Sequence, residues 1–153
     1  MILRFGSLLL ILYALGFALF GVTLGKPAAT DAARTEGIVV ITGGAGRIEH
    51  GVQILADGHG QRLLVAGTDP AVTKADLIRR LGGKRWLERR QYKSLRLVTS
   101  DWHMRRARYE FRRVLGDDYR VVPDAVRTEP GFMTLFGEYN KYLLRRIAVW
   151  LDI

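Results

Sequence analysis

Residues 94–115, SLRLVTSDWHMRRARYEFRRVL, decide the fold of this chain. The short apolar, β-branched run at residues 95–99 predicts a buried strand, and from Met104 onward apolar residues recur at helical spacing. The chain therefore passes from a strand into a helix around residues 99–103. In an open parallel sheet such a transition lies at the carboxyl edge of the strands, where ligands of these folds usually bind.

The same order of strand and helix recurs on both sides of this stretch. Further strands are predicted at residues 37–42, 62–66 and 119–122, the last closed by Pro123 and followed by a loop over residues 124–130. Helices are predicted over residues 47–56, 70–81, 84–91 and 131–153. This alternation predicts an α/β fold in which a parallel sheet is covered by helices on both faces, which makes three layers. One strand is missing from it, because the helices over residues 70–81 and 84–91 follow each other directly.

The amino-terminal part has the character of a transmembrane helix. Residues 5–25, FGSLLLILYALGFALFGVTLG, carry no charge and, at about 1.5 Å per residue, are long enough to cross a hydrocarbon core of about 30 Å. We therefore expect a membrane anchor over residues 1–26, a linker over residues 27–36 and one α/β domain over residues 37–153.

The length of the apolar run favours an uncleaved anchor over a cleaved signal peptide, and no A-x-A site precedes Lys26. A span followed by one soluble domain is the ordinary layout of an exported protein. We therefore expect the amino terminus in the cytoplasm and the domain on the periplasmic side of the bacterial plasma membrane.

The net charge of +9 points to an anionic partner, but the 24 basic residues are spread along the chain without a block of Lys and Arg interleaved with stacking aromatics, which disfavours nucleic acid. A cationic domain tethered beside a membrane suits anionic headgroups or phosphorylated, lipid-linked ligands. The chain has no cysteine, and His50, His59 and His103 lack metal-ligand spacing, so no structural zinc site is expected. The sequence does not identify a cofactor.

Two turns carry the candidate site. In the first, Gly43, Gly44 and Gly46 lie between a strand and a helix, where free backbone N–H groups and the helix dipole favour an anion that Arg47 could approach. The pattern is not a dinucleotide fingerprint, because Glu49 stands where a third glycine is needed. The structural alternative is a tight turn that needs glycine for its backbone angles.

The second turn is rich in polar groups, which are Ser100, Asp101, Trp102, His103, Arg105 and Arg106. The predicted helix start puts Arg105 and Arg106 in the first turn, where cations oppose the helix dipole unless an anion is bound nearby. His103 could transfer a proton near neutral pH or donate to a phosphate. The structural alternatives are a solvated pair of Arg106 with Glu110, and helix capping by Asp101 or Ser100.

The strand–GGxGR–helix unit and the sequence VTSDWHMRRA at residues 98–107 resemble the ElyC/SanA/YdcF-like family of bacterial envelope proteins. The resemblance covers residues 37–153 and includes the Ala66-Gly67 turn. It implies a membrane anchor, a Rossmann-like domain outside the cytoplasm and a role in cell-envelope or peptidoglycan-precursor biogenesis. Relatives carry a further strand and a polar loop of the form S/T-x-N-T where this chain runs from Gly83-Lys84 directly into Arg85, so an internal deletion is expected there.

These features give three functional hypotheses. In the first, both turns face one cleft that binds an anionic, phosphorylated envelope precursor; if the protein is an enzyme, His103 transfers the proton beside Asp101, and Arg47 and Arg105 stabilise phosphate charge. The second is a non-catalytic anion-binding or regulatory module. The third is a nucleotide or S-adenosylmethionine binder.

Two further features are less specific. Asp69 could contact a ribose or a metal, although capping the helix that begins at Pro70 is the simpler interpretation. The carboxyl-terminal aromatic residues are expected to be core, and Trp150, near Arg145 and Arg146, could alternatively touch the bilayer. These aromatic residues are Phe132, Phe136, Tyr139, Tyr142 and Trp150.

Overall fold

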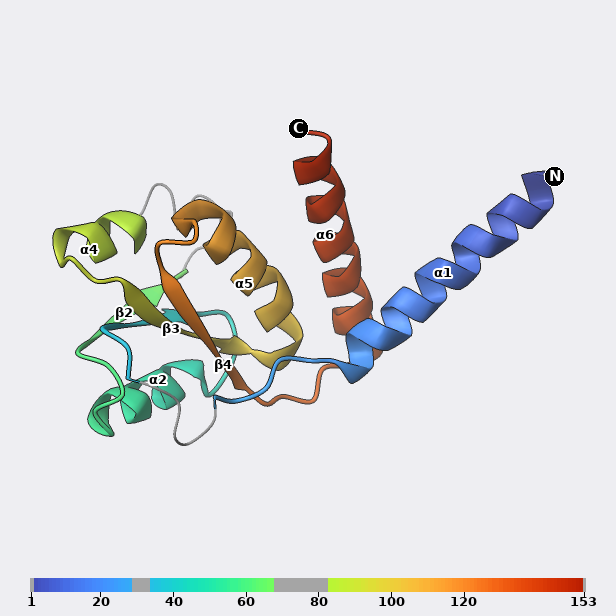
Figure 1. The fold of residues 1–153 in the computed structure, drawn as a ribbon. Helices are drawn as coiled ribbons and strands as arrows, with labels where there is room; N and C mark the ends of the chain where they lie inside the picture. Colours follow the sequence, from blue (N-terminus) through green and yellow to red (C-terminus); the bar gives the residue numbers. More distant parts are fainter. Residues whose placement is uncertain (1, 29–33, 68–82, 153) are drawn as a thin grey trace. The chain divides into compact units, whose positions relative to one another are not determined.

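The computed structural model describes residues 2–28, 34–67 and 83–152 (Figure 1). The chain divides into two compact units. Residues 25–128 form an α/β unit, and residues 1–24 and 129–153 together form a helical unit.

The α/β unit is built on a four-stranded, all-parallel sheet. Its strands are β1 (Gly37–Ile41), β2 (Arg62–Ala66), β3 (Ser94–Ser100) and β4 (Arg120–Val126), in the order β2-β1-β3-β4. Its helices are α2 (Arg47–Ala56), α4 (Gly83–Arg89) and α5 (Asp101–Leu115). The predicted α/β fold with a Rossmann-like parallel sheet is confirmed.

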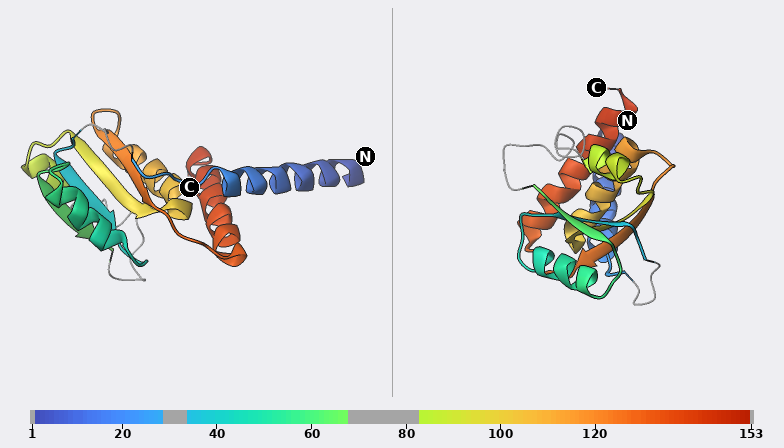
Figure 2. Two further views of the ribbon diagram at one scale, coloured as in Figure 1. Left: turned by 90° about the horizontal axis from the view of Figure 1, so that it is seen from below. Right: turned by 90° about the vertical axis from the view of Figure 1, so that its left-hand side faces the viewer.

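Alternate residues of the buried strands pack on opposite faces of the sheet. Val39, Leu95 and Leu97 join one apolar cluster with residues of α4 and α5, whereas Ile38 and Val98 join a second cluster with α2. The helices therefore cover both faces and make three layers, as Figures 1 and 2 show. All residues of β1 and β3 are buried because both of their faces are covered, and β1 is apolar throughout.

The predicted end of the last strand was wrong. β4 continues through Pro123, which pairs with Leu97, and ends only at Val126. β4 pairs with β3 alone, so it is an edge strand. Proline has no backbone N–H to donate to a neighbouring strand, and an edge strand tolerates it because only one of its sides is paired.

The helix before β3 is confirmed as α4, but part of the neighbouring region is not described. The helix predicted over residues 70–81, with Asp69 and Pro70, lies outside the described residues. Among the described residues no strand lies between β2 and β3. The internal deletion itself stays a prediction.

The helical unit consists of α1 (Ile2–Val22) and α6 (Phe132–Trp150). Within α1, Arg4–Val22 is long and apolar enough to cross a membrane. The aromatic face of α6, expected to be core, packs against α1: the ring centroids of Phe17 and Tyr139 are 5.5 Å apart, and those of Tyr13 and Tyr139 are 5.2 Å apart. The prediction of core positions was wrong for Phe132, which is 64% exposed, and for Trp150, which is 83% exposed.

Candidate functional site

The two predicted turns meet at the centre of the carboxyl edge of the sheet. β1 and β3 are neighbours, and the chain continues from β1 to β2 on one side and from β3 to β4 on the other. Open α/β sheets bind ligands where the strand order reverses in this way. The glycine turn follows β1 and α5 begins directly after β3, so the candidate residues lie at this reversal.

The glycine turn closes around the side chain of Arg47. Gly43 and Gly46 have φ of 102° and 76°, a region that favours glycine. A Cβ atom at Gly44 would lie 2.7 Å from Arg47 Nη2, so the turn also needs a glycine there to make room for the guanidinium.

Arg47 is buried, at 2% exposed, and binds acceptors of the chain itself. Its Nη1 donates to the carbonyl oxygens of Ile41 (3.0 Å) and Thr42 (2.9 Å), and its Nε donates to Ser100 Oγ (2.9 Å). The expectation was a side chain directed at a ligand. The guanidinium is turned inward because β1 ends with buried carbonyl groups that need donors.

Ser100 joins the two turns. Its backbone occupies the N-cap position of α5, but its hydroxyl makes no capping bond and accepts from Arg47 instead. The bond between Arg47 and Ser100 therefore brings the residue after the glycine turn and the residue before α5 into direct contact across 53 positions of sequence.

Asp101 binds both chain segments that lead to the helical unit. Its backbone oxygen accepts from Gly25 N (2.9 Å), and its carboxylate accepts from Thr128 N (3.2 Å) and Thr128 Oγ1 (2.6 Å). The carboxylate also accepts from Trp102 N (2.9 Å). We call Asp101 with Gly25 and Thr128 the Asp101 clasp. These contacts give Asp101 a structural role that the sequence did not reveal, because Thr128 is distant in sequence and stands in a predicted loop.

Both ends of the predicted linker are also bound to the α/β unit. Ala28 N donates to Asp124 Oδ1 (2.9 Å), and Thr35 N donates to the carbonyl oxygen of His59 (3.0 Å). Gly25 lies so close to α5 that a Cβ atom there would be 2.6 Å from Met104 Cβ. The chain that leaves α1 therefore lies against the start of α5.

His103 is fully buried and its ring is already engaged. Its Nδ1 lies 3.3 Å from Arg106 Nη2. A guanidinium can only donate, so Nδ1 accepts, and the neutral ring carries its proton on Nε2. Trp102 lies between the two turns, with its ring centroid 5.7 Å from Arg47 Cζ and 5.7 Å from that of His103.

The helix begins earlier than predicted, and this changes the argument for Arg105 and Arg106. Because α5 starts at Asp101, both arginines lie in its second turn, and Asp101 occupies the first. The dipole effect falls off within the first turn, so it no longer requires an anion beside these cations. Both side chains are half-buried.

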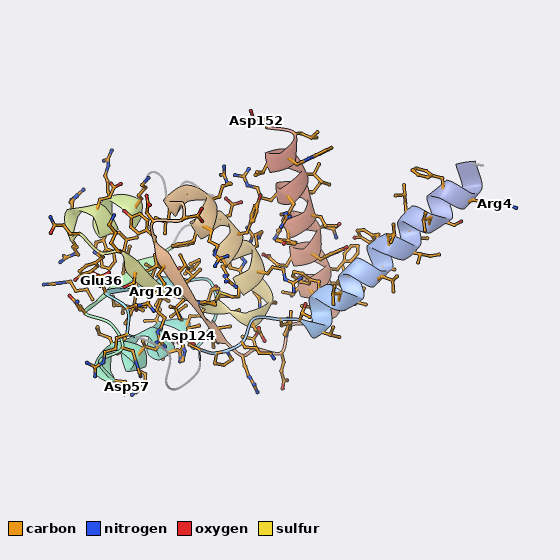
Figure 3. All side chains as sticks on the ribbon, in the orientation of Figure 1. Arg4, Glu36, Asp57, Arg120, Asp124 and Asp152 are labelled. Carbon is orange, nitrogen blue, oxygen red and sulfur yellow. The ribbon has the colours of Figure 1, made fainter. Side chains whose placement is uncertain are left out.

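A second buried polar cluster was missed at the sequence level. Asp124, which is labelled in Figure 3, accepts from Arg96 Nη1 (3.0 Å) and from Ala28 N (2.9 Å), and lies 3.1 Å from His50 Nε2. Burial alone would raise the pKa of Asp124, but the hydrogen bonds from Ala28, His50 and Arg96 outweigh it and hold the pKa below its ordinary value. A charged Arg96 inside an apolar strand was the available signal for a buried partner.

A polar cleft of about 420 Å³ lies elsewhere, beside the end of α5 opposite to the candidate site. It is lined by Lys84, Arg85, Glu88, Arg113 and Val114. It contains none of the predicted site residues.

In the part of the chain that the structure describes, no group of three or more His, Asp, Glu or Cys side chains is placed to hold a metal ion. Comparison of the chain with protein-family models, with curated proteins and with solved structures finds no match.

Proposed function

We propose that this chain is a membrane-anchored protein of the bacterial cell envelope that binds an anionic, phosphorylated ligand at the carboxyl edge of its sheet. In this proposal α1 crosses the plasma membrane and the α/β unit lies on the periplasmic side. The ligand is a cell-wall precursor, free or lipid-linked, as the resemblance of residues 98–107 to the ElyC/SanA/YdcF-like family implies.

The observation that carries the proposal is the meeting of the two turns at the reversal of strand order. The amino ends of α2 and α5 both begin at this edge, next to β1 and β3, and each carries a partial positive charge. Arg105 and Arg106, which are half-buried, add cationic side chains from α5. Together these groups favour an anion over a cation or a neutral ligand.

The connection to α1 supports a ligand at the membrane surface. Gly25, which the Asp101 clasp holds at the start of α5, is only three residues after Val22, the last residue of α1. Three residues span at most about 10 Å. If α1 crosses the membrane, the candidate site is tethered close to the lipid headgroups.

The geometry supports binding better than catalysis. Arg47 binds three acceptors of the chain, and the buried His103 accepts a hydrogen bond from Arg106, so neither is presented for reaction. We therefore favour the non-catalytic anion-binding module. In the enzymatic alternative His103 carries the proton, which requires the ring to become accessible when the ligand binds.

The test is ligand binding by the detergent-solubilised full chain. A polyprenyl phosphate and inorganic phosphate should raise the melting temperature, whereas ATP and S-adenosylmethionine should not. Arg105→Ala should weaken phosphate binding about tenfold or more, because it removes a charged donor. Arg112→Ala, which removes an exposed cation of the same helix, is the matched control.

Stabilisation by ATP or S-adenosylmethionine alone would favour the nucleotide alternative, and stabilisation by none of the four would contradict an anion site. Turnover of a phosphorylated ligand that His103→Ala abolishes without loss of binding would establish the enzymatic alternative.

The location of the α/β unit is tested separately in intact bacterial cells. The chain has no native cysteine, so Asp57→Cys, at an exposed position beyond α2, gives one site for a membrane-impermeant maleimide. Labelling before lysis is expected for a periplasmic unit. Labelling only after lysis would place it in the cytoplasm.

A further inference from the structure

α6 exposes apolar side chains near its start and along its C-terminal half. These side chains are Met133, Leu144, Ile147 and Leu151, between 49% and 74% exposed, and we call them the α6 stripe. Their helical spacing puts them on one side of the helix and its C-cap. Trp150 lies beside them and is 83% exposed.

The adjoining part of the apolar face holds α6 against α1. The ring of Phe17 lies 5.5 Å from that of Phe132, and Tyr13 Oη donates to Asn140 Oδ1 (2.9 Å). Tyr139 Oη donates to the carbonyl oxygen of Tyr13 (3.1 Å) and lies directly beside Gly16, where a side chain would collide with it. α6 is therefore docked on the apolar helix by specific contacts.

If α1 crosses a membrane, the position of these contacts along α1 determines how deep α6 lies in that membrane. The contacts fall between Tyr13 and Phe20, and Phe17 at their centre precedes the end of α1 at Val22 by five residues, which is about 7.5 Å along the helix axis. Amphipathic helices at membrane surfaces lie about 5–10 Å into the boundary between headgroups and acyl chains. Figures 1 and 2 show that the two helices meet near the C-terminal end of α1 and diverge from there.

The charges of α6 fit the same location. Lys141, Arg145 and Arg146 lie outside the α6 stripe, and Lys141 and Arg146 are exposed. Cations on the polar side of an amphipathic helix attract anionic headgroups, and a tryptophan at the edge suits the interface between water and lipid.

We infer that α6 is a second membrane-binding element, which lies in the headgroup region with the α6 stripe against the acyl chains and its cations toward anionic headgroups. This inference rests on the proposed crossing of the membrane by α1. It explains the exposed apolar surface of α6 as a lipid contact, and this surface is separate from the candidate site in the α/β unit.

Fluorescent labels on single introduced cysteines test the inference in the full chain, reconstituted into vesicles of phosphatidylethanolamine and phosphatidylglycerol. Leu144→Cys places an environment-sensitive dye on the α6 stripe, and Lys141→Cys places it about one turn away, outside the stripe. Leu12→Cys, at an exposed position of α1, reports the anchor itself. Nitroxides attached to lipid near the headgroup or near the chain end act as quenchers, and iodide acts from water.

The dye at Leu144→Cys should be quenched several-fold more by the shallow lipid nitroxide than the dye at Lys141→Cys, which iodide should quench instead. The dye at Leu12→Cys should be quenched by the deeper lipid nitroxide. If lipid nitroxides quench the dye at Leu12→Cys but iodide quenches the dyes at Leu144→Cys and Lys141→Cys equally, the inference about α6 is wrong. The proposed membrane crossing by α1 would then still hold.

A dye at Leu144→Cys that neither lipid nitroxides nor iodide can quench would mean that protein, such as a second copy of the chain, covers the stripe, which also overturns the inference. Absence of lipid quenching at Leu12→Cys would overturn both the anchor and the inference.

Discussion

Arg47, Asp101 and Asp124 are three buried polar side chains that each join segments far apart in the sequence. Arg47 ties the end of β1 to Ser100, the carboxylate of Asp101 binds Thr128, and Asp124 binds Arg96 and Ala28. A buried polar group left without a hydrogen-bond partner lowers the free energy of unfolding by more than one hydrogen bond normally adds to it. Each of these three residues is therefore sensitive to substitution.

Asp101→Ala should lower the free energy of unfolding of the full chain by about 1–3 kcal/mol, because Thr128 loses both of its bonds to the carboxylate. Urea unfolding in detergent measures this change. Asp117→Ala, at an exposed carboxylate, should stay within about 0.5 kcal/mol of the parent chain. Equal free energies of unfolding for the two variants would contradict a structural role of the Asp101 side chain.

Arg47→Lys separates a structural role of Arg47 from a role in ligand binding alone. An ammonium cannot reach Ile41, Thr42 and Ser100 with the fork geometry of a guanidinium, so we expect a loss of about 1–3 kcal/mol. The melting temperature without ligand is the measurement. A variant of unchanged stability that binds phosphate less tightly would show that the ligand, not the fold, needs the guanidinium.

Asp124 should make stability depend on pH on the acid side. Its pKa is lowered on folding from the ordinary value of 3.8, so its contribution is full above about pH 4 and is lost as the pH falls through the folded-state pKa. Urea midpoints should therefore decrease on acidification, and Asp124→Asn should be less stable near pH 7 with a shallower acid decrease. Asp118→Asn, at an exposed carboxylate, should keep the slope of the parent chain.

At the scale of elements, the sequence predicted those helices and strands whose formation depends on residues close together in the chain. β2 was predicted at its observed bounds, and α2 follows from helical spacing after the glycine turn. The passage of β4 through Pro123 could not be predicted, because it depends on β4 being an edge strand. The early start of α5 also escaped prediction, since the clasp with Gly25 and Thr128 involves residues far away in sequence.

The same division holds for the candidate site. The order of strands and turns predicted that the glycine turn and the Ser100–Arg106 segment would lie at one edge of the sheet, where the structure has them. The directions of the Arg47 and His103 side chains could not be predicted from local sequence, because they depend on the carbonyl groups of Ile41 and Thr42 and on Arg106. Ligand binding at this edge stays a prediction.

Two helical glycines give a matched test of element packing. A Cβ atom at Gly51 in α2 would collide with Val40 of β1, which is fully buried, whereas nothing lies within 4 Å of a Cβ atom at Gly137 in α6. Gly51→Ala should destabilise the chain by about 1–3 kcal/mol. Gly137→Ala should be neutral or stabilising by up to about 1 kcal/mol. Calorimetric melting measures both, and a stabilising Gly51→Ala would contradict the close packing of α2 on β1.

At the scale of the whole molecule, the helical unit is assembled from the two ends of the described chain. α1 contributes an apolar surface, and α6 contributes the aromatic side chains that pack on it. The amphipathic pattern of α6 was visible in the sequence, but its partner was not, since an apolar face fits a sheet, another helix or lipid equally well.

Gly16→Ile should release α6 from α1, because Tyr139 leaves no room for a side chain at Gly16. Gly21→Ile is the matched control in the same helix, with nothing within 4 Å of its Cβ position. Hydrogen exchange of the α6 amides should become faster in the first variant and stay unchanged in the second. Equal exchange in both would contradict the contact between α1 and α6.

The Asp101 clasp has a topological consequence. Asp101 binds Gly25, where the chain enters the α/β unit, and Thr128, where the chain leaves this unit. Residues 25–128 therefore have the connectivity of a domain inserted between two helices. Domains with adjacent ends tolerate transplantation and circular permutation. A short peptide between Thr128 and Gly25 should therefore close this segment into a ring without disturbing its sheet.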